Sequence, residues 1–289
     1  MLKQRVISAI VMIAAVLAAL FGLSPLPFTL VLFGVIVLGM WEWAQFAGFK
    51  SPVGRAIVAL ATFGLLIFPI MASTDYIRSA RFLTDETTPL LFVSCIWWAL
   101  ALYLVVTYPS SAKWWEKSVV AKFVFGFCTL IPFFIATLAL RFYHYHQSEY
   151  AGLWVLLYVF ILVWAADSGA YFFGKAFGKH KLAAKVSPGK SIEGALGGLV
   201  TAGLIAFAFL HVAPENVFGR ELSLLPFILL SIATVAISIL GDLAESMFKR
   251  QAGIKDSSQL IPGHGGILDR IDSLTAAVPF FATFFFLVL

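Results

Sequence analysis

The chain has 289 residues, of which 61% are hydrophobic and 12% are charged, and its formal net charge at pH 7 is +5. Globular proteins carry about 25% charged residues, so this composition excludes a soluble globule, whose surface needs more polar residues than the chain contains. It predicts an all-α integral membrane protein. The positive charge requires no nucleic acid partner, because cytoplasmic loops of membrane proteins carry an excess of lysine and arginine.

Nine apolar runs have about the length that crosses 30 Å of hydrocarbon. They predict a polytopic bundle of about nine transmembrane helices. In chain order the runs are Val6–Gly22, Pro27–Trp43, Arg55–Ala72, Pro89–Tyr108, Val119–Leu140, Tyr150–Ala166, Gly194–Val212, Leu224–Leu240 and Leu274–Leu289.

The positions of lysine and arginine predict the orientation of this bundle. With the N-terminus in the cytoplasm, all but four of the 20 lysines and arginines fall in inner loops, the exceptions being Arg78, Arg81, Arg141 and Arg220. We therefore expect a cytoplasmic N-terminus. We also expect the two charged segments, 167–193 and 242–272, to be loops that face the compartment containing nucleoside triphosphates.

Residues 1–149 form the N-terminal part of the predicted bundle and contain few ionisable groups within their helices. Glu42, between Trp41 and Trp43 at the end of an apolar run, has two interpretations. It can take part in function, or it can extend to the membrane interface as an ordinary snorkelling side chain. We favour the second interpretation, and we expect this part to build a cavity that lipids can enter.

Residues 150–289 form the predicted catalytic part, whose first charged segment begins at Asp167. An aspartate at the end of an apolar helix is costly unless it is paired or coordinates an ion. Further on, Gly189-Lys190-Ser191 matches the end of a P-loop, but Ala184 stands where that motif needs its first glycine. Ser187-Pro188 predicts instead a helix N-terminus that can bind phosphate, with Lys190 and Ser191 in its first turn.

A pair of glycines, Gly194 and Gly198, follows this segment. The Gly-x-x-x-Gly spacing lets two helices approach closely in lipid. The pair can serve packing within the fold, a homodimer, or both.

The densest group of charges lies in the second segment. If the preceding helix continues to about Gly253, Asp242, Glu245 and Lys249 share one face of it. The run 262–266, Pro-Gly-His-Gly-Gly, predicts a turn whose backbone amides can approach an anion closely. Carboxylates for a divalent cation, cations for phosphate and a glycine-rich turn together indicate metal-assisted phosphoryl or nucleotidyl transfer.

Several motifs stand at fixed spacing in these segments. In the second segment they are Ser246-Met-Phe-Lys249-Arg250, Lys255-Asp256, Ile261-Pro262-Gly263-His264-Gly265-Gly266-Ile267 and Asp269-Arg270-Ile271-Asp272. In the first they are Asp167-Ser168-Gly169-Ala170-Tyr171 with Lys175, and Ser187-Pro188-Gly189-Lys190-Ser191-Ile192-Glu193-Gly194. Together they resemble the bacterial phosphatidate cytidylyltransferases, also called CDP-diacylglycerol synthases. The resemblance is specific in the C-terminal half and extends to the N-terminal half only as a hydrophobic bundle of similar length.

The resemblance implies a nucleotidyltransferase of phospholipid biosynthesis at the cytoplasmic face of a bacterial inner membrane. Its substrates would be CTP and phosphatidic acid, its products CDP-diacylglycerol and pyrophosphate, and its cofactor Mg²⁺, with a second cation as an option. The implied catalytic residues are Asp242, Asp269, Lys249 and His264. The implied metal ligands are Asp242 and Asp269, with Glu245, Asp167 or Asp272 in support. The implied substrate-binding residues are Lys175, Lys190, Ser191, Arg250, Lys255, Gly263, Gly265, Gly266 and Arg270.

Two other functions stay open at this point. A CTP-dependent lipid kinase would transfer the γ-phosphate and release CDP. An ion-coupled secondary transporter would use intramembrane carboxylates to bind ions, although no inverted repeat is visible and the charges collect in two loops. The role of His264 is also open, because it can donate to the leaving pyrophosphate, act as an acid or brace the turn.

Overall fold

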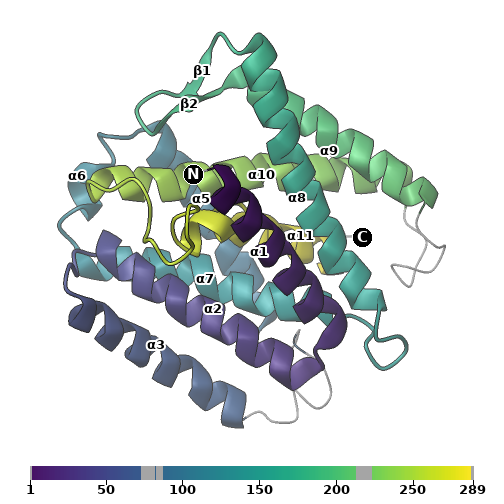
Figure 1. The fold of residues 1–289 in the computed structure, drawn as a ribbon, viewed down its shortest axis with the longest axis horizontal. Helices are drawn as coiled ribbons and strands as arrows, with labels where there is room; N and C mark the ends of the chain where they lie inside the picture. Colours follow the sequence, from purple (N-terminus) through teal and green to yellow (C-terminus); the bar gives the residue numbers. More distant parts are fainter. Residues whose placement is uncertain (1, 73–81, 83–86, 213–222, 288–289) are drawn as a thin grey trace.

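The computed structural model describes residues 2–72, 82, 87–212 and 223–287, which form a bundle of long helices (Figure 1). A helix covers each of the nine predicted runs to within two residues of its ends. The helices are α1 (Leu2–Gly22), α2 (Pro25–Phe46), α3 (Pro52–Ala72), α5 (Thr88–Val106), α6 (Ala112–Trp115), α7 (Val119–Arg141), α8 (Ala151–Phe177), α9 (Ile192–Val212), α10 (Leu224–Gln251) and α11 (Leu268–Leu287). Arg78, Arg81 and Arg220, which we expected in outer loops, lie outside the described residues.

The helices have the length and composition of membrane spans. Among the described residues, α2, α5 and α7 to α11 are long and apolar enough to cross a bilayer, and α1 and α3 contain shorter apolar stretches. Helices suit hydrocarbon because every interior backbone donor and acceptor is satisfied within the segment. The chain is therefore an all-α polytopic membrane protein, while the count of about nine spans and the cytoplasmic N-terminus stay predictions.

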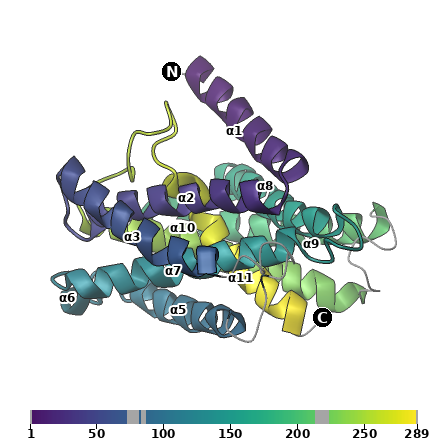
Figure 2. The same cartoon turned by 90° about the horizontal axis from the view of Figure 1, so that it is seen from below.

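The centre of the bundle is α11. Its residues Ala276, Ala277, Val278, Phe281 and Phe285 have no exposed surface. Helix α10 packs along it, and α7, α5 and α8 contact it as well. Helix α1, in contrast, slants away from the other helices, with the N-terminus at its far end (Figure 2). Helix α11 is therefore surrounded by other helices.

The segment 167–193 is only partly a loop, which corrects our expectation. Helix α8 continues for ten residues past Asp167 and ends at Phe177. Strands β1 (Lys181–Ala183) and β2 (Ser187–Ser191) then form an antiparallel hairpin. The predicted helix start at Ser187 was wrong, because these residues pair with β1 and the helix begins only at Ile192. Lys190 and Ser191 consequently lie on a strand.

The hairpin is tied to α9 by Glu193. Its carboxylate accepts from the backbone amides of Lys179 at 3.1 Å and His180 at 3.2 Å, and it lies 2.6 Å from Nδ1 of His180. An acidic side chain in the first turn of a helix is also favoured by the helix dipole. These contacts fix where the hairpin stands relative to α9.

Small residues let α8 and α9 pack closely. A Cβ atom added at Gly194 would lie 2.8 Å from the carbonyl oxygen of Ala170, and one added at Gly198 would lie 3.1 Å from that of Ala166. The Gly-x-x-x-Gly pair therefore serves packing within the fold. Gly197 is equally confined, because its added Cβ would overlap the ring and Cβ of Phe173.

We expect Gly197→Ala to lower the free energy of unfolding by about 1–3 kcal/mol, the usual cost of overpacking. Gly203→Ala, in the same helix, is the matched control, because its new Cβ would lie 3.6 Å from the nearest atom of Ile232, an ordinary contact. Both substitutions gain the same helix propensity. Thermal unfolding of the two variants in one detergent measures the difference, and equal melting temperatures would contradict this account of the α8–α9 interface.

Candidate active site

A cavity of about 1190 Å³ has α1 as one wall and the C-terminal helices as the opposite wall. Its apolar lining comes largely from α1, α2, α7 and α8 and includes Met12, Val16, Leu32, Phe133 and Phe160. Its polar lining includes Asp167, Lys175, Lys190, Ser191, Asp242, Lys249, Asp256, His264, Asp269, Arg270 and Asp272. An apolar surface and a strongly charged surface therefore meet in one space.

The structure separates the predicted site residues into two groups. Ten of them line the cavity, namely Asp167, Lys175, Lys190, Ser191, Asp242, Lys249, His264, Asp269, Arg270 and Asp272. The others, Glu245, Arg250, Lys255, Gly263, Gly265 and Gly266, are not part of its wall. Arg250 instead donates from Nε to the carbonyl oxygen of Val186 at 3.4 Å. It thereby connects the end of α10 to the hairpin.

The hairpin brings Lys190 to α10. Its Nζ lies 2.5 Å from Oδ2 of Asp242, and the hydroxyl of Ser246 donates to Oδ1 of the same carboxylate at 3.3 Å. Asp167 of α8 is near enough for its charge to be repelled by Asp242 and attracted by Lys190. Three separate elements, α8, β2 and α10, thus meet at one cluster of charges.

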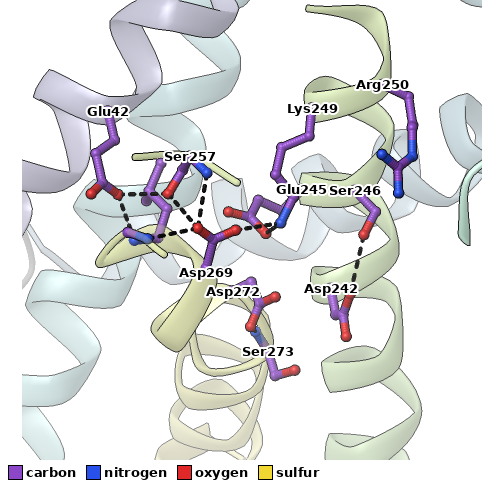
Figure 3. Close-up of polar contacts among 12 residues, drawn as sticks. Glu42, Asp242, Glu245, Ser246, Lys249, Arg250, Ser257, Asp269, Asp272 and Ser273 are labelled. Carbon is purple, nitrogen blue, oxygen red and sulfur yellow. Dashed lines mark hydrogen bonds and ion pairs between the residues drawn. The ribbon is translucent and has the colours of Figure 1, made fainter. Parts of the chain in front are cut away.

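Lys249 lies at the centre of a buried ion triad. Its Nζ donates to Glu245 Oε2 at 2.5 Å and to Asp269 Oδ1 at 2.6 Å. The contact with Glu245 follows from their i, i+4 spacing on α10, and the contact with Asp269 joins α10 to α11 (Figure 3). The predicted shared face of Asp242, Glu245 and Lys249 is confirmed by the continuation of α10 to Gln251.

Asp272 has no cation partner among the described residues. Its Oδ1 accepts from the backbone amide of Ser273 at 2.7 Å. Asp242 and Glu245 lie across the space between α10 and α11 from it (Figure 3). Near Asp242 the carboxyl groups of Asp167, Glu245, Asp269 and Asp272 thus outnumber the two cations, Lys190 and Lys249.

The loop before α11 folds around Asp269. Oδ2 of Asp269 accepts from the amide and hydroxyl of Ser257, at 2.8 and 2.9 Å, and from the amide of Gly266 at 2.8 Å. Ile261 and Gly265 pair across the tight turn, in which Gly263 and Gly265 have φ of 77° and 85°, values that favour glycine. We expected the glycine amides to face an anion, but the amide of Gly266 faces a carboxylate of the protein itself.

Glu42 is the residue whose surroundings sequence reasoning missed. We expected it at the membrane interface, yet its side chain is completely buried. It accepts hydrogen bonds from Ser257, Ser258, Ile267 and Leu268, more than 200 residues further along the chain. Figure 3 shows the contact with Ser257. A carboxylate within an apolar run was the available signal, because such a residue is costly without partners.

The donor set of the cavity fits a hard divalent cation. Among the described residues, no group of three or more His, Cys, Asp or Glu side chains converges as a preformed metal site. Mg²⁺ does not need one, because it commonly binds one or two carboxylates and completes its shell with water and substrate phosphates. Asp242 and Asp272 are carboxyl groups of the cavity wall, and their oxygens are of the kind that such an ion binds.

Comparison with known proteins agrees with the signature in the sequence. The model of the cytidylyltransferase family matches residues 3–288. A phosphatidate cytidylyltransferase of Haemophilus influenzae is 58% identical over 291 residues, covering 100% of both chains. Those of Pseudomonas aeruginosa and Bacillus subtilis are 42% and 32% identical, covering 98% and 96% of this chain and 96% of each relative. The similarity thus includes the N-terminal half, where no motif had been visible.

We expect Lys249→Ala to lower the free energy of unfolding by about 3–5 kcal/mol, because it leaves Glu245 and Asp269 buried without their cation. Lys190→Ala should change it by less than about 1 kcal/mol, because the pair with Asp242 is partly exposed to solvent. Thermal unfolding of both variants in the same detergent measures the contrast. A larger loss for Lys190→Ala than for Lys249→Ala would mean that the buried triad does not stabilise the site.

Proposed function

The chain belongs to the cytidylyltransferase family, and from this premise we propose that it converts CTP and phosphatidate to CDP-diacylglycerol and pyrophosphate. The observation that carries the proposal is the cavity, in which an apolar wall meets a wall of carboxylates and lysines. A substrate with acyl chains and a phosphate needs both surfaces, and so does its reaction with a nucleotide. The full-length similarity to phosphatidate cytidylyltransferases supports the same reaction.

The proposed reaction is an in-line displacement at the α-phosphorus of CTP. An oxygen of the lipid phosphate forms a bond to this phosphorus, the bond to the β-phosphate oxygen breaks, and its electron pair leaves with pyrophosphate. A phosphate monoester has a second pKa of about 6, so the nucleophile is already ionised near neutral pH. The main obstacle is repulsion between two polyanions, which makes charge neutralisation and positioning the chief tasks of the site.

We propose that the cations of the cavity wall bind the phosphates. Lys175, Lys190 and Arg270 line the cavity and are placed for this role. Lys249 has three donors, of which Glu245 and Asp269 accept two, so one is left for a phosphate oxygen. His264 also lines the cavity, where one of its ring nitrogens would donate to the leaving pyrophosphate.

We propose Mg²⁺ as the cofactor, held chiefly by Asp242 and Asp272 with Asp167 beside them. When bound, the ion neutralises phosphate charge and supports the departure of pyrophosphate. Asp269 and Glu245 are weaker candidates for ligands. Asp269 already has four hydrogen-bond donors in contact, one of them the Ser257 hydroxyl that it shares with Glu42, and Glu245 lies outside the cavity wall. Lys255, Arg250 and the three glycines stay predicted substrate contacts.

We propose that the protein resides in a bacterial inner membrane with its site on the cytoplasmic side. The relatives named above are bacterial, CTP is a cytoplasmic substrate, and the lysine-rich segments follow the positive-inside pattern. The division into a cavity-forming part, 1–149, and a catalytic part, 150–289, remains part of this proposal, as does a homodimer.

The reaction is tested with CTP labelled at either end. We expect label at the α-phosphorus to enter the lipid and label at the γ-phosphorus to appear in pyrophosphate, in mixed micelles that contain phosphatidate and Mg²⁺. A lipid kinase would place the γ-label in the lipid and release CDP. Nucleotide-independent uptake into vesicles, with no labelled lipid, would favour a transporter. Omitting phosphatidate or Mg²⁺ should abolish the transfer.

We expect Asp242→Asn and Asp272→Asn each to lower turnover by about a hundredfold or more, because each removes a charged ligand at the proposed ion. The melting temperature without Mg²⁺ should stay close to that of the wild type, while the increase produced by added Mg²⁺ should disappear. Glu149→Gln, at an exposed carboxylate away from the cavity wall, is the control. Near-normal turnover and an unchanged Mg²⁺ response in either variant would contradict the ligand assignment.

A further inference from the structure

The carboxylate of Glu42 joins α2 to the loop that precedes α11. Oε1 accepts from the hydroxyl of Ser258 at 2.6 Å and from the amide of Ile267 at 2.9 Å. Oε2 accepts from the hydroxyl of Ser257 at 2.9 Å and from the amide of Leu268 at 2.7 Å. Each oxygen thus receives one hydroxyl and one backbone N–H, and both ends of the loop meet at a single side chain.

The backbone amides of Ile267 and Leu268 require an acceptor at both Oε1 and Oε2 of residue 42. Leu268 is the first residue of α11, so its amide has no carbonyl partner within the helix. Glu42 supplies that partner from another helix, and its negative charge lies at the positive end of the α11 dipole. A glutamine would present an NH₂ group to one of the two backbone donors, which would leave a buried N–H without an acceptor.

The contact with Glu42 continues directly to Asp269. The hydroxyl of Ser257 lies 2.9 Å from both carboxylates, and the amide of the same residue donates to Asp269 at 2.8 Å. A Cβ atom at Gly266 would overlap the Ser257 hydroxyl and the Glu42 carboxylate, so the backbone is packed against this contact. Moving Glu42 would therefore move the donors that hold Asp269.

A second side chain of α2 secures the same loop. Gln45, one turn after Glu42, donates to the carbonyl oxygen of Ser257 at 2.6 Å. Neither Glu42 nor Gln45 lines the cavity, whereas Asp269, Arg270 and Asp272 do. Any influence of Glu42 and Gln45 on the reaction must therefore pass through the loop and the start of α11.

We infer that Glu42 is a positioning residue, which orients Asp269, Arg270 and Asp272 in the cavity by fixing residues 257–268 against α2. The inference rests on the proposed cytidylyl transfer for its kinetic consequence only. Its structural consequence, the order of this loop, stands by itself. The N-terminal helices then contribute to the geometry of the charged site as well as to the apolar wall.

The experiment compares Glu42→Gln with Glu116→Gln. Glu116 accepts a single hydrogen bond, from Nε2 of Gln251 at 2.7 Å, and an amide oxygen can accept it equally well. We expect Glu42→Gln to lower kcat by about ten- to a hundredfold, since small misplacement of catalytic groups costs up to that much. The KM for phosphatidate should change by less than about threefold, because the apolar wall stays intact. Glu116→Gln should leave both constants unchanged.

Hydrogen exchange supplies a readout that does not depend on the reaction. In Glu42→Gln the amides of 257–268 should exchange faster, while those of α7 keep their protection. If the wild-type protein proves to have another activity while the loop of Glu42→Gln still exchanges faster, the proposed reaction is refuted and the role of Glu42 stays in place. Unchanged exchange, or a normal kcat per folded molecule, would overturn the inference.

Ser258→Ala covers the case in which Glu42→Gln fails to fold. It removes one of the four donors and leaves both backbone amides paired. We expect a smaller decrease in kcat, in the same direction and with faster exchange of the loop. In a foldable double variant the two losses should not add, because both act on one contact. Full activity of Ser258→Ala with an unchanged loop would count against the inference.

Discussion

A carboxylate buried in a membrane protein needs donors or a cation, because removing its charge from water costs several kcal/mol. Asp269 satisfies this requirement with Lys249 from α10, the amide and hydroxyl of Ser257, and the amide of Gly266. These partners come from three stretches of chain. If one of these partners moved away, the Asp269 carboxylate would lose its cation or a hydrogen bond. These contacts therefore hold the end of α10, the loop and the start of α11 together.

Periodic patterns in the sequence predicted much of this arrangement. Long apolar runs predict helices because a helix pairs its interior backbone polar groups within one segment of chain. The i, i+4 spacing of Glu245 and Lys249 places their side chains in contact once α10 continues past Leu240. The spacing of Gly194 and Gly198 permits the close approach of α8 and α9. Each of these features depends on neighbours within one helix or on the smallest side chains.

Contacts between distant parts of the chain could not be predicted in the same way. Glu42 meets residues beyond position 256, and nothing near Glu42 in the sequence indicates such partners. Ser187-Pro188 has the local signal of a helix start, yet pairing with β1 prevails and carries Lys190 to Asp242. Local reasoning predicted that the amide of Gly266 binds an anion, but in the folded chain this amide donates to Asp269. Local propensity is overridden where a strand or a buried charge supplies a stronger partner.

The apolar wall formed by α1, α2, α7 and α8 has an energetic consequence for a lipid substrate. Moving an acyl chain from the membrane into water costs about 0.8 kcal/mol for each CH₂ group. For two chains, this transfer free energy would exceed the free energy that most active sites gain by binding a substrate. In the proposed reaction, an apolar lining continuous with the charged wall would let the chains stay among hydrocarbon while the head group binds at the lysines. The nucleotide then reaches the site from water, and the acyl chains of the lipid stay in the hydrocarbon of the membrane.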